Sequence, residues 1–283
     1  MPKGTVTAMQ VVGKSWITPH LVRLELAGPD GAALADFPMS PHADAYVKLV
    51  LPPRGVSLPW PYDAEALKQA LPPEQWPVLR TYTIRDFTPQ RMMIDVVVHG
   101  DDGVAGPWAR DVEPCGPGSL LQVRGPGGAY SPDPSARHHL LVGDASALPA
   151  IAVALERLRP GATADVVIGV ASAADEIPLD TRATAQITWV HEGAAAAGPG
   201  EALVAAVHAL DLPEGEGIDA FVHGEAGWVK ALRRHLRFER GIPRERLSIS
   251  GYWRLGSTDE QWRTGKAQWR AEVEADEAAA GLR

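Results

Sequence analysis

The 283-residue sequence contains a single cysteine, Cys115, which excludes an internal disulfide, a cysteine-built structural zinc site and an iron–sulfur cluster. We interpret Cys115 as a partly buried bystander. The sequence also lacks any apolar run near the roughly 18 residues that a membrane-spanning helix requires. Its first residues, Met-Pro-Lys-Gly, do not begin an apolar signal region. We therefore expect a cytoplasmic protein without an integral membrane segment.

The sequence also contains fewer basic residues than acidic ones. The chain has 27 Lys and Arg residues against 35 Asp and Glu residues, which gives a formal net charge of -8. This balance argues against a nucleic-acid partner or an anionic membrane surface. An anionic ligand would therefore need a local basic patch. At roughly 150 residues per domain, the length predicts about two domains, and we expect a monomer.

Two catalytic signatures are missing. No Gly-x-Ser-x-Gly elbow occurs, so a hydrolase has no obvious nucleophile. Among the nine histidines only His138 and His139 are adjacent, and on a strand their side chains point to opposite faces. Because no His-x-x-x-His or Glu-x-x-His cluster is present, we expect no protein-built metal site.

The first part of the chain is rich in predicted strands. Clusters of glycine and proline separate these runs, as in a sandwich or barrel. The expected strands are Thr5–Val12, Leu21–Leu26, Ala45–Leu51, Leu79–Phe87, Met92–His99 and Ser119–Val123. A short helical insertion is expected at Asp63–Leu71, and Gly125 to Gly128 is interpreted as a turn.

The pattern changes after a linker at Ser131–Ser135. Strands then alternate with helices, which predicts a parallel sheet covered on both faces. The expected strands are His138–Val142, Ala164–Val170, Gln186–Val190, Ile218–Val222 and Leu247–Ser250. The expected helices are Ala147–Leu158, Glu201–Leu210 and Ala226–Arg240. We expect an N-terminal antiparallel β-barrel domain (1–133) and a C-terminal α/β parallel-sheet nucleotide-binding domain (137–257).

The tail, residues 258–283, is helical in composition. Trp262, Trp269 and Val273 follow one another at intervals of seven and four residues, which places them on one stripe of a helix. The stripe favours a helix docked on its own domain. A cap over a cofactor pocket is the alternative.

Residues 80 to 83 carry the strongest chemical signal. Arg80 and Tyr82 should share one face of a strand, with Thr83 on the other. The segment offers a cation for a phosphate, a ring for stacking and a hydroxyl donor, all of which a flavin dinucleotide needs. Ordinary strands also contain Arg-x-Tyr-Thr by chance, so a structural role stays open for this segment alone.

A second candidate segment begins where Val98 and His99 end a strand in a glycine-rich turn that runs to Gly103. The helix expected next contains Ala105, Gly106, Trp108 and Ala109. Small residues let backbone N–H groups approach an anion, and a helix N-terminus adds partial positive charge. The pattern suits a pyrophosphate, although a plain connection between strand and helix fits it equally well.

Three strand ends in the second domain should meet at one edge of the sheet, where ligands bind in open α/β folds. They are the segments around Gly143-Asp144-Ala145-Ser146, around Gly224-Glu225, and Tyr252-Trp253-Arg254 between glycines. Ser146 is the expected N-cap of the following helix. The first junction lacks Gly-x-Gly-x-x-Gly, so its dinucleotide-binding signal is weak by itself. It also lacks the Gly-Lys-Ser/Thr of a P-loop, which argues against an NTPase.

Taken together, these segments resemble the siderophore-interacting protein family of flavin-dependent ferric-siderophore reductases, within the ferredoxin-reductase-like group. The resemblance spans nearly the whole chain. Arg80-x-Tyr82-Thr83 resembles the flavin motif, and His99-Gly-Asp with Gly103 and Trp108 resembles the flavin-phosphate segment.

The second half carries the rest of the resemblance. Gly143-Asp144 and the Ala-Leu-Pro-Ala that follows resemble Gly-Asp-Glu-Thr-Ala-Leu-Pro-Ala. Gly224-Glu225 and Tyr252-Trp253-Arg254-x-Gly resemble late signatures, of which the Tyr-Trp-Arg-x-Gly ending is the most family-specific.

The resemblance implies roles for these residues. Arg80 would hold the pyrophosphate of FAD, Tyr82 would lie against the flavin, and Thr83 would sit near its N5, with Thr81 in the same segment. Backbone from Ala105 to Ala109 would cradle phosphates. The strand ends of the second domain would bind the nicotinamide nucleotide.

Some positions depart from the family pattern. Val104 and Gly106 replace the usual proline and serine, so a hydroxyl to the phosphate is lost. Ala145 replaces a glutamate. Glu192 stands where many relatives carry an arginine, and its charge would repel a 2′-phosphate, which favours NADH over NADPH.

The implied function is an NAD(P)H-dependent, FAD-containing reductase that releases iron from ferric siderophores as Fe(II). Many ferric siderophores are anionic, so a basic mouth is required; Arg254 is the first candidate, followed by Lys48 and Arg124. Two alternatives stay open: a flavin oxidoreductase that passes electrons to a protein or quinone, and a non-enzymatic binder of ferric siderophores.

Overall fold

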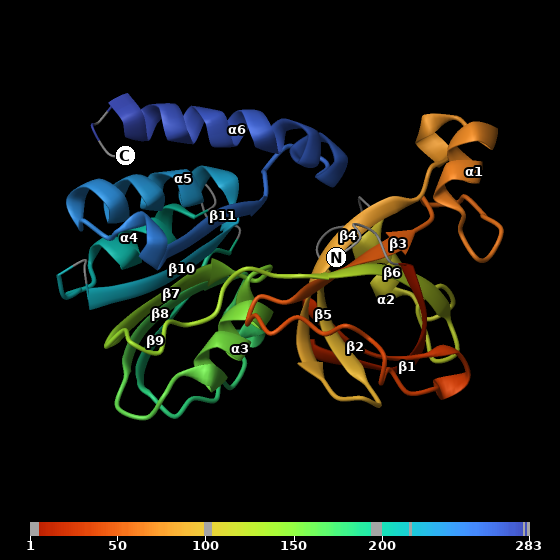
Figure 1. Cartoon of the computed structure of the whole chain (residues 1–283), viewed down its shortest axis with the longest axis horizontal. Coiled ribbons are helices and arrows are strands. Elements are labelled where there is room, and N and C mark those ends of the chain that lie inside the picture. Colours follow the sequence, from red (N-terminus) through yellow and green to blue (C-terminus); the bar gives the residue numbers. More distant parts are fainter. Residues whose placement is uncertain (1–5, 99–103, 194–199, 215–216, 280, 282–283) are drawn as a thin grey trace. The chain divides into compact units, whose positions relative to one another are not determined.

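The computed structural model describes residues 6–98, 104–193, 200–214, 217–279 and 281. The chain divides into two compact units, residues 1–129 and 130–283. The first is a closed antiparallel barrel and the second is a parallel sheet with helices, so the expected fold class is confirmed (Figure 1). Each unit is described in turn below.

The barrel strands are hydrogen-bonded in the order β1-β2-β5-β4-β3-β6, and β6 pairs with β1 to close the ring. Alternation of apolar and polar residues places one set of side chains inside, where the largest buried members include Met9, Leu24 and Leu49. The strands are β1 (Val6–Thr18), β2 (Leu21–Ala27), β3 (Tyr46–Leu51), β4 (Val78–Phe87), β5 (Met92–Val97) and β6 (Leu120–Gly127).

Two short helices accompany the barrel. The predicted insertion is α1 (Ala64–Ala70), which begins where the Asp63 side chain accepts hydrogen bonds from the N–H groups of Glu65 and Ala66. The helix expected after the glycine-rich turn is α2 (Ala105–Arg110). Short 3₁₀ turns lie at Pro29–Gly31 and Pro73–Gln75. Cys115 is fully buried in the barrel core, and burial raises the pKa of its thiol to about 12, which keeps it protonated at neutral pH.

The second unit contains a parallel sheet in the order β11-β10-β7-β8-β9. Its first strand in sequence, β7, lies in the middle, and the chain adds strands first on one side and then on the other. The order therefore reverses between β7 and β10. The strands are β7 (His138–Asp144), β8 (Thr163–Val170), β9 (Thr184–His191), β10 (Ile218–Glu225) and β11 (Leu247–Trp253).

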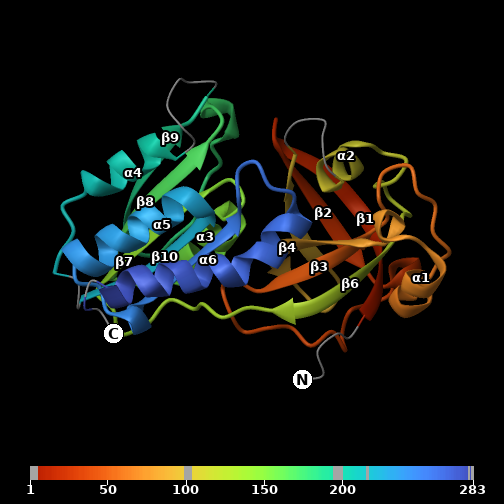
Figure 2. The ribbon, with the colours of Figure 1, turned by 90° about the horizontal axis from the view of Figure 1, so that it is seen from above.

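Helices cover both faces of this sheet. The helix α3 (Leu148–Arg157) lies on one face, and α4 (Glu201–His208) and α5 (Ala226–Arg234) lie on the other (Figures 1 and 2). A five-residue π-helix, His235–Glu239, continues α5, and 3₁₀ turns lie at Ala173–Asp175 and Arg244–Arg246. The sequence predicted one continuous helix to Arg240, but the backbone widens at His235, where the Arg240 N–H donates to the His235 carbonyl.

The tail forms a long helix, α6 (Asp259–Ala279), which runs along α5 (Figure 2). The predicted stripe of Trp262, Trp269 and Val273 is buried in the apolar cluster that also contains Leu232 and Leu236. The Glu277 carboxylate accepts two hydrogen bonds from the Arg233 guanidinium, at 2.7 and 2.9 Å. The helix is therefore docked on its own unit. Within the described residues, no helix combines the length and the apolarity that a bilayer crossing would need.

The extent of β6 differs from expectation. The sequence placed a turn at Gly125 to Gly128, but the strand continues to Gly127 and Gly127 pairs with Tyr46 of β3. A Cβ atom at Gly127 would lie 2.3 Å from Cζ of Tyr46. The glycine thus permits the phenol ring to lie against the strand, and this packing explains why glycine persists inside a strand.

The Arg233–Glu277 pair gives a test of how α6 is held. Hydrogen bonds from Arg233 hold the pKa of Glu277 below its usual value. Glu277→Gln should lower the free energy of unfolding by about 1–3 kcal/mol near neutral pH. The loss should shrink as the pH falls through that lowered pKa, because the carboxylate then protonates in the native protein and its advantage disappears. Chemical denaturation at several pH values measures both effects.

The matched control is Asp276→Asn, which removes an exposed carboxylate that pairs with Lys230 at 2.8 Å. Exposed pairs contribute little, so we expect a change below about 0.5 kcal/mol. Equal effects of the two substitutions would contradict the assignment of Glu277 as the main polar anchor of α6.

Candidate cofactor and substrate site

Strand β4 presents its site residues on two sides. Arg80 and Tyr82 lie opposite Leu49 and Val47 of β3, whereas Thr81 and Thr83 lie opposite Lys48 and Tyr46. Arg80 and Tyr82 therefore share one side of the strand, as the alternation predicted. Both are half-buried, Thr81 is exposed, and Thr83 is 7% exposed.

A row of side chains crosses three neighbouring strands beside Thr81. Lys48 of β3 lies opposite both Thr81 of β4 and Arg124 of β6. The Lys48 ammonium also lies 5.8 Å from the centroid of the Tyr46 ring. The structure thus brings together two of the three basic residues that the sequence suggested for substrate binding. Arg254, the third, is exposed on the second unit, just after β11.

Tyr46 is a candidate that the sequence analysis missed. It lies opposite Thr83, the residue expected beside the flavin, and its ring is accommodated by Gly127. The only sequence signal for Tyr46 was the pair of glycines, Gly127 and Gly128, of which Gly127 leaves space for an aromatic ring from a neighbouring strand. That signal appears only once the strand pairing is known.

The helix α2 offers uncapped backbone N–H groups. Ala105 and Ala109 are buried in the barrel core and Trp108 packs against it, so the helix is held firmly. Its N-cap residue, Val104, makes no side-chain capping bond. The N–H groups of the first turn, including that of Gly106, suit an anion.

The residues before α2 complete this segment only in part. Val98 is buried, and its N–H donates to the His20 carbonyl at 2.8 Å. His99 and Gly103, which the sequence also assigned to the flavin-phosphate segment, lie outside the described residues.

The carboxylate of Asp144 connects the carboxyl ends of three strands in the second unit. Its Oδ2 accepts the Glu225 N–H of β10 at 2.9 Å and the Trp253 indole N–H of β11 at 2.8 Å. Its Oδ1 accepts the N–H and the hydroxyl of Ser146 at 2.9 and 2.5 Å. Burial raises the pKa of Asp144, while these four donors oppose that rise.

The expectation that Ser146 caps the next helix is wrong. The helix α3 begins at Leu148 with Ala147 as its N-cap, and no side chain caps it. Ser146 instead turns back to Asp144, because an aspartate two residues upstream offers a stronger acceptor for its N–H and hydroxyl.

Two glycines permit this close arrangement. Gly143 lies within β7, one residue before its end, and a Cβ atom there would lie 2.6 Å from the Cβ of Ala147. Gly224 has φ of +154°, and a Cβ atom there would lie 2.4 Å from Oδ2 of Asp144 and 2.3 Å from the Trp228 ring. Only glycine fits at position 224 without moving these side chains.

Glu225 is the N-cap residue of α5. Its Oε2 accepts the N–H groups of Gly227 and Trp228, and its Oε1 accepts the N–H of Leu255 at 3.2 Å. Glu192, which follows β9, lies near Asp144 and Glu225, so three carboxylates are grouped here. Burial raises the pKa of Glu192, and the charges of Asp144 and Glu225 raise it further.

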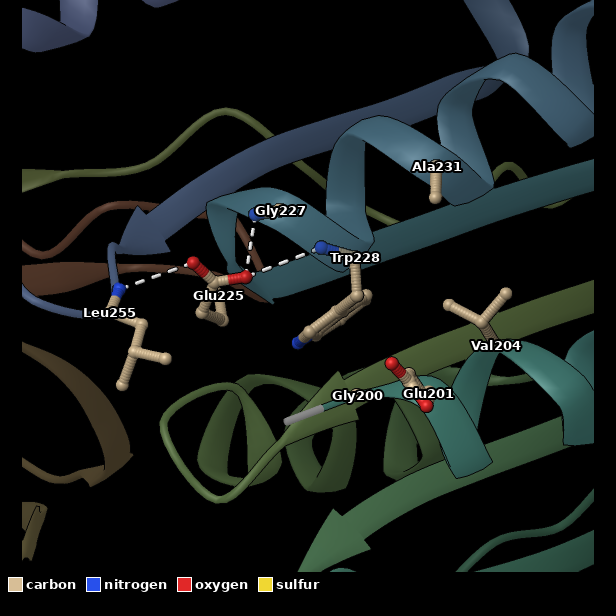
Figure 3. A pocket seen from close by; sticks show the side chains of 8 residues that line it. All are labelled: Gly200, Glu201, Val204, Glu225, Gly227, Trp228, Ala231 and Leu255. Atoms are coloured by element: carbon tan, nitrogen blue, oxygen red, sulfur yellow. Dashed lines mark hydrogen bonds between the residues drawn. The ribbon is translucent and has the colours of Figure 1, made fainter. Parts of the chain in front are cut away.

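A pocket of about 470 Å³ opens beside this group, between the N-terminal ends of α4 and α5 (Figure 3). The Trp228 indole lies over Gly200, where a Cβ atom would come within 2.3 Å of the ring. Val204 and Leu255 add apolar walls, and Glu201 and Glu225 add carboxylates. Among the described residues, no lysine or arginine lines this pocket. Trp228 was not among the residues expected from the sequence.

Tyr252 belongs to a stack of rings along the strands. Its ring centroid lies 4.8 Å from that of His223, which stacks on Phe221 at 4.1 Å. Burial lowers the pKa of His223 to about 3, so the imidazole is neutral at ordinary pH. Its Nε2 lies 3.0 Å from the Ser248 hydroxyl. Tyr252 is therefore positioned by packing, whereas its neighbour Trp253 is positioned by Asp144.

The barrel followed by this sheet has a ferredoxin-reductase-like fold. The FAD/NAD-binding part of a nitric oxide dioxygenase from Vibrio cholerae shares the fold, with a TM-score of 0.61 over 87% of this chain and 98% of that chain at 15% identity. Residues 10–130 match the siderophore-interacting FAD-binding domain, and residues 136–256 match the siderophore-interacting protein model. The chain belongs to the siderophore-interacting protein family.

Individual relatives agree with this assignment. An uncharacterized protein of Mycobacterium tuberculosis is 39% identical, over 96% of each chain. The ferric vibriobactin reductase ViuB of Vibrio cholerae is 32% identical, over 90% of this chain and 91% of its own. The siderophore-interacting protein SipS of Aeromonas hydrophila superposes with a TM-score of 0.76 over 95% of this chain and 100% of its own, at 31% identity.

Gly224→Ala tests the close packing at the carboxyl ends of β7 and β10. The added methyl would displace Asp144 or Trp228, so the free energy of unfolding should fall by about 2–3 kcal/mol. The near-ultraviolet circular dichroism of the tryptophans should change as well. The control is Gly265→Ala in α6, where a Cβ atom meets nothing within 4 Å. That variant should gain about 1 kcal/mol from helix propensity. An unchanged free energy of unfolding in Gly224→Ala would contradict this packing.

Proposed function

We propose that this protein is an NAD(P)H-dependent, FAD-containing reductase of ferric siderophores that releases the iron as Fe(II). The observation that carries the proposal is its 32% identity to a ferric vibriobactin reductase over 90% of the chain. The match of residues 10–130 to a siderophore-interacting FAD-binding domain supports the cofactor. The proposed role of the protein is to bind and orient two redox partners of a bound flavin.

Residues of the barrel suit FAD. Arg80 would neutralise the pyrophosphate, and the uncapped first turn of α2 would donate backbone N–H groups to it. Tyr82 would pack against the flavin, and Thr83 would donate its hydroxyl near N5. Tyr46, opposite Thr83, would limit the space beside it. When bound, FAD supplies the redox chemistry, since it accepts hydride from a nicotinamide and can give single electrons to Fe(III).

The nicotinamide nucleotide would bind at the carboxyl ends of the second unit's strands, where the strand order reverses. Gly143, Asp144 and Ser146 would form the turn beneath it, and the uncapped N-terminus of α3 offers partial positive charge to its phosphates. Asp144 and Glu225 direct their carboxylates at protein donors, so their charges are largely satisfied.

The pocket beside Trp228 suits a planar, weakly polar ring better than a phosphate, because its charged lining residues are the acidic Glu201 and Glu225. We therefore assign the pocket to a ring of the nucleotide, stacked on the indole. Glu192 retains a carboxylate in the same region. A 2′-phosphate brought near it would meet repulsion, so we propose NADH as the preferred donor.

The substrate would be recognised by charge. The chain is acidic overall, so an anionic ferric chelate needs local cations. Lys48 and Arg124 lie side by side on the barrel, and Arg254 lies on the second unit. Reduction weakens the iron complex because Fe(II) carries less charge and suits hard oxygen ligands less well than Fe(III) does.

The role of Arg80 predicts a loss of FAD binding. Arg80→Ala should weaken FAD affinity by at least about tenfold, because a charge-assisted contact to phosphate is lost. Fluorescence titration of the cofactor-free protein with FAD measures the dissociation constant. Arg91→Ala, in the turn between β4 and β5, is the control and should bind FAD like the unmodified protein. Equal affinity of both variants would remove Arg80 from the proposed site.

The role of Arg254 predicts a change in substrate affinity alone. Arg254→Ala should raise the apparent KM for an anionic ferric chelate severalfold and leave FAD content unchanged, because the residue is exposed and lies outside the barrel. Steady-state reduction assays with anionic and neutral ferric chelates provide the comparison. Unchanged kinetics with the anionic chelate would exclude Arg254 from substrate binding.

A further inference from the structure

Two histidines and a glutamate meet at the ends of α4 and α5. His208 is the last residue of α4, and His235 and Glu239 are the first and last residues of the π-helix that follows α5. One ligand atom of each residue can be chosen so that all three lie within 4.8 Å of one another. None of these residues belongs to the candidate cofactor and substrate site.

Of the three side chains, His235 is buried and fixed, whereas His208 and Glu239 are exposed and can move. His235 is 8% exposed, which holds its ring in place, and its Nδ1 lies 2.7 Å from Oε2 of Glu239. The His208 ring stacks on the His235 ring, with centroids 3.9 Å apart and planes inclined by 28°. His208 and Glu239 are exposed, so both can turn without disturbing the core.

The π-helix makes this meeting possible. An i to i+5 bond, from the Arg240 N–H to the His235 carbonyl at 3.1 Å, widens the backbone at this point. Such widened turns occur frequently at functional sites. Here the turn carries both His235 and Glu239, one at each end.

Imidazole nitrogens and a carboxylate oxygen form a ligand set typical of zinc and other divalent first-row ions. Such bonds are about 2.0–2.2 Å long, which puts neighbouring ligand atoms roughly 3.3 Å apart around a tetrahedral ion. The 2.7 Å between Nδ1 of His235 and Oε2 of Glu239 would have to widen to this value, and the separations to His208, at most 4.8 Å, would have to close to it. Both changes can be made by the exposed side chains of Glu239 and His208. Magnesium and calcium prefer oxygen ligands throughout and fit this set poorly.

The surroundings favour a cation. The C-terminal end of α4 brings partial negative charge to His208. The neighbouring Arg240 guanidinium donates to the carbonyl oxygens of Leu212 and Pro213, so it is engaged away from Glu239. The positive charge of Arg234, next to His235 in the sequence, acts on Glu239 and opposes the binding of a cation. A cavity of about 280 Å³ beside Glu239 leaves room for a water ligand, and its lining includes one more carboxylate, Glu214, and one cation, Arg240.

We propose that His208, His235 and Glu239 bind one divalent transition-metal ion of the zinc class. The ion would join the end of α4 to the π-turn after α5. Because these two helices also provide the walls of the Trp228 pocket at their opposite ends, the ion would hold that pocket's frame together. His208 and His235 are separated by 27 residues in the sequence, so no motif of closely spaced histidines marks this site.

Titration of the full-length, EDTA-treated protein with Co²⁺ and then Zn²⁺ tests the site. Co²⁺ should produce visible d–d absorption that saturates at one ion per chain, and Zn²⁺ should displace it. Saturating Zn²⁺ should raise the melting temperature by on the order of 5 °C, because the ion binds the folded protein preferentially. Absence of a saturable Co²⁺ band in the unmodified protein would refute the proposal.

Variants identify the ligands. His208→Ala and Glu239→Gln change exposed residues, so both should fold, and each should weaken Zn²⁺ binding at least about tenfold. His191→Ala is the matched control, because His191 pairs with Glu176 at 2.7 Å but has no third ligand among the described residues. It should bind Zn²⁺ like the unmodified protein. Full affinity in both His208→Ala and Glu239→Gln, or an equal loss in His191→Ala, would overturn the assignment.

Discussion

The second unit depends on one buried carboxylate. Asp144 ends the central strand, β7, and accepts hydrogen bonds from the backbone of β10 and from the indole at the end of β11. A buried carboxylate is tolerated only when such donors satisfy it, so the three strand ends are held in fixed relation. Gly224 gives the space for this contact. The proposed nucleotide site is therefore preorganised by the same group that stabilises the sheet.

In the barrel, the proposed site residues are held in place by apolar packing and not by a buried carboxylate. Its interior is filled by aliphatic side chains, and the alternation of β4 then decides where Arg80, Tyr82 and Thr83 can point. The small residues Ala105 and Ala109 anchor α2 without using its N–H groups. Each unit thus supplies a rigid backbone surface for a different part of the proposed reaction. The redox chemistry would belong to the cofactor, which agrees with the lack of a Gly-x-Ser-x-Gly elbow in the sequence.

Sequence reasoning reached those features that depend on local periodicity. Alternation gave the barrel strands, alternating strands and helices gave the parallel sheet, and the spacing of Trp262 and Trp269 gave the docked face of α6. It failed where contacts between segments distant in the sequence determine the local structure. The bond from Ser146 to Asp144 and the ring of Tyr46 against Gly127 follow from tertiary contacts. The widened turn at 235–239 likewise has no periodic signature, and the pocket around Trp228 becomes visible only when α4 and α5 are placed.

The central claim is that this chain carries electrons from a nicotinamide nucleotide to siderophore-bound iron. Anaerobic stopped-flow absorbance of the FAD-loaded protein tests it most directly. The account predicts that NADH bleaches the flavin absorbance and that a ferric siderophore then restores it, while a chelator traps one Fe(II) for each electron. A flavin that stays oxidised with both NADH and NADPH would contradict the account, as would a reduced flavin that a quinone reoxidises but a ferric siderophore does not.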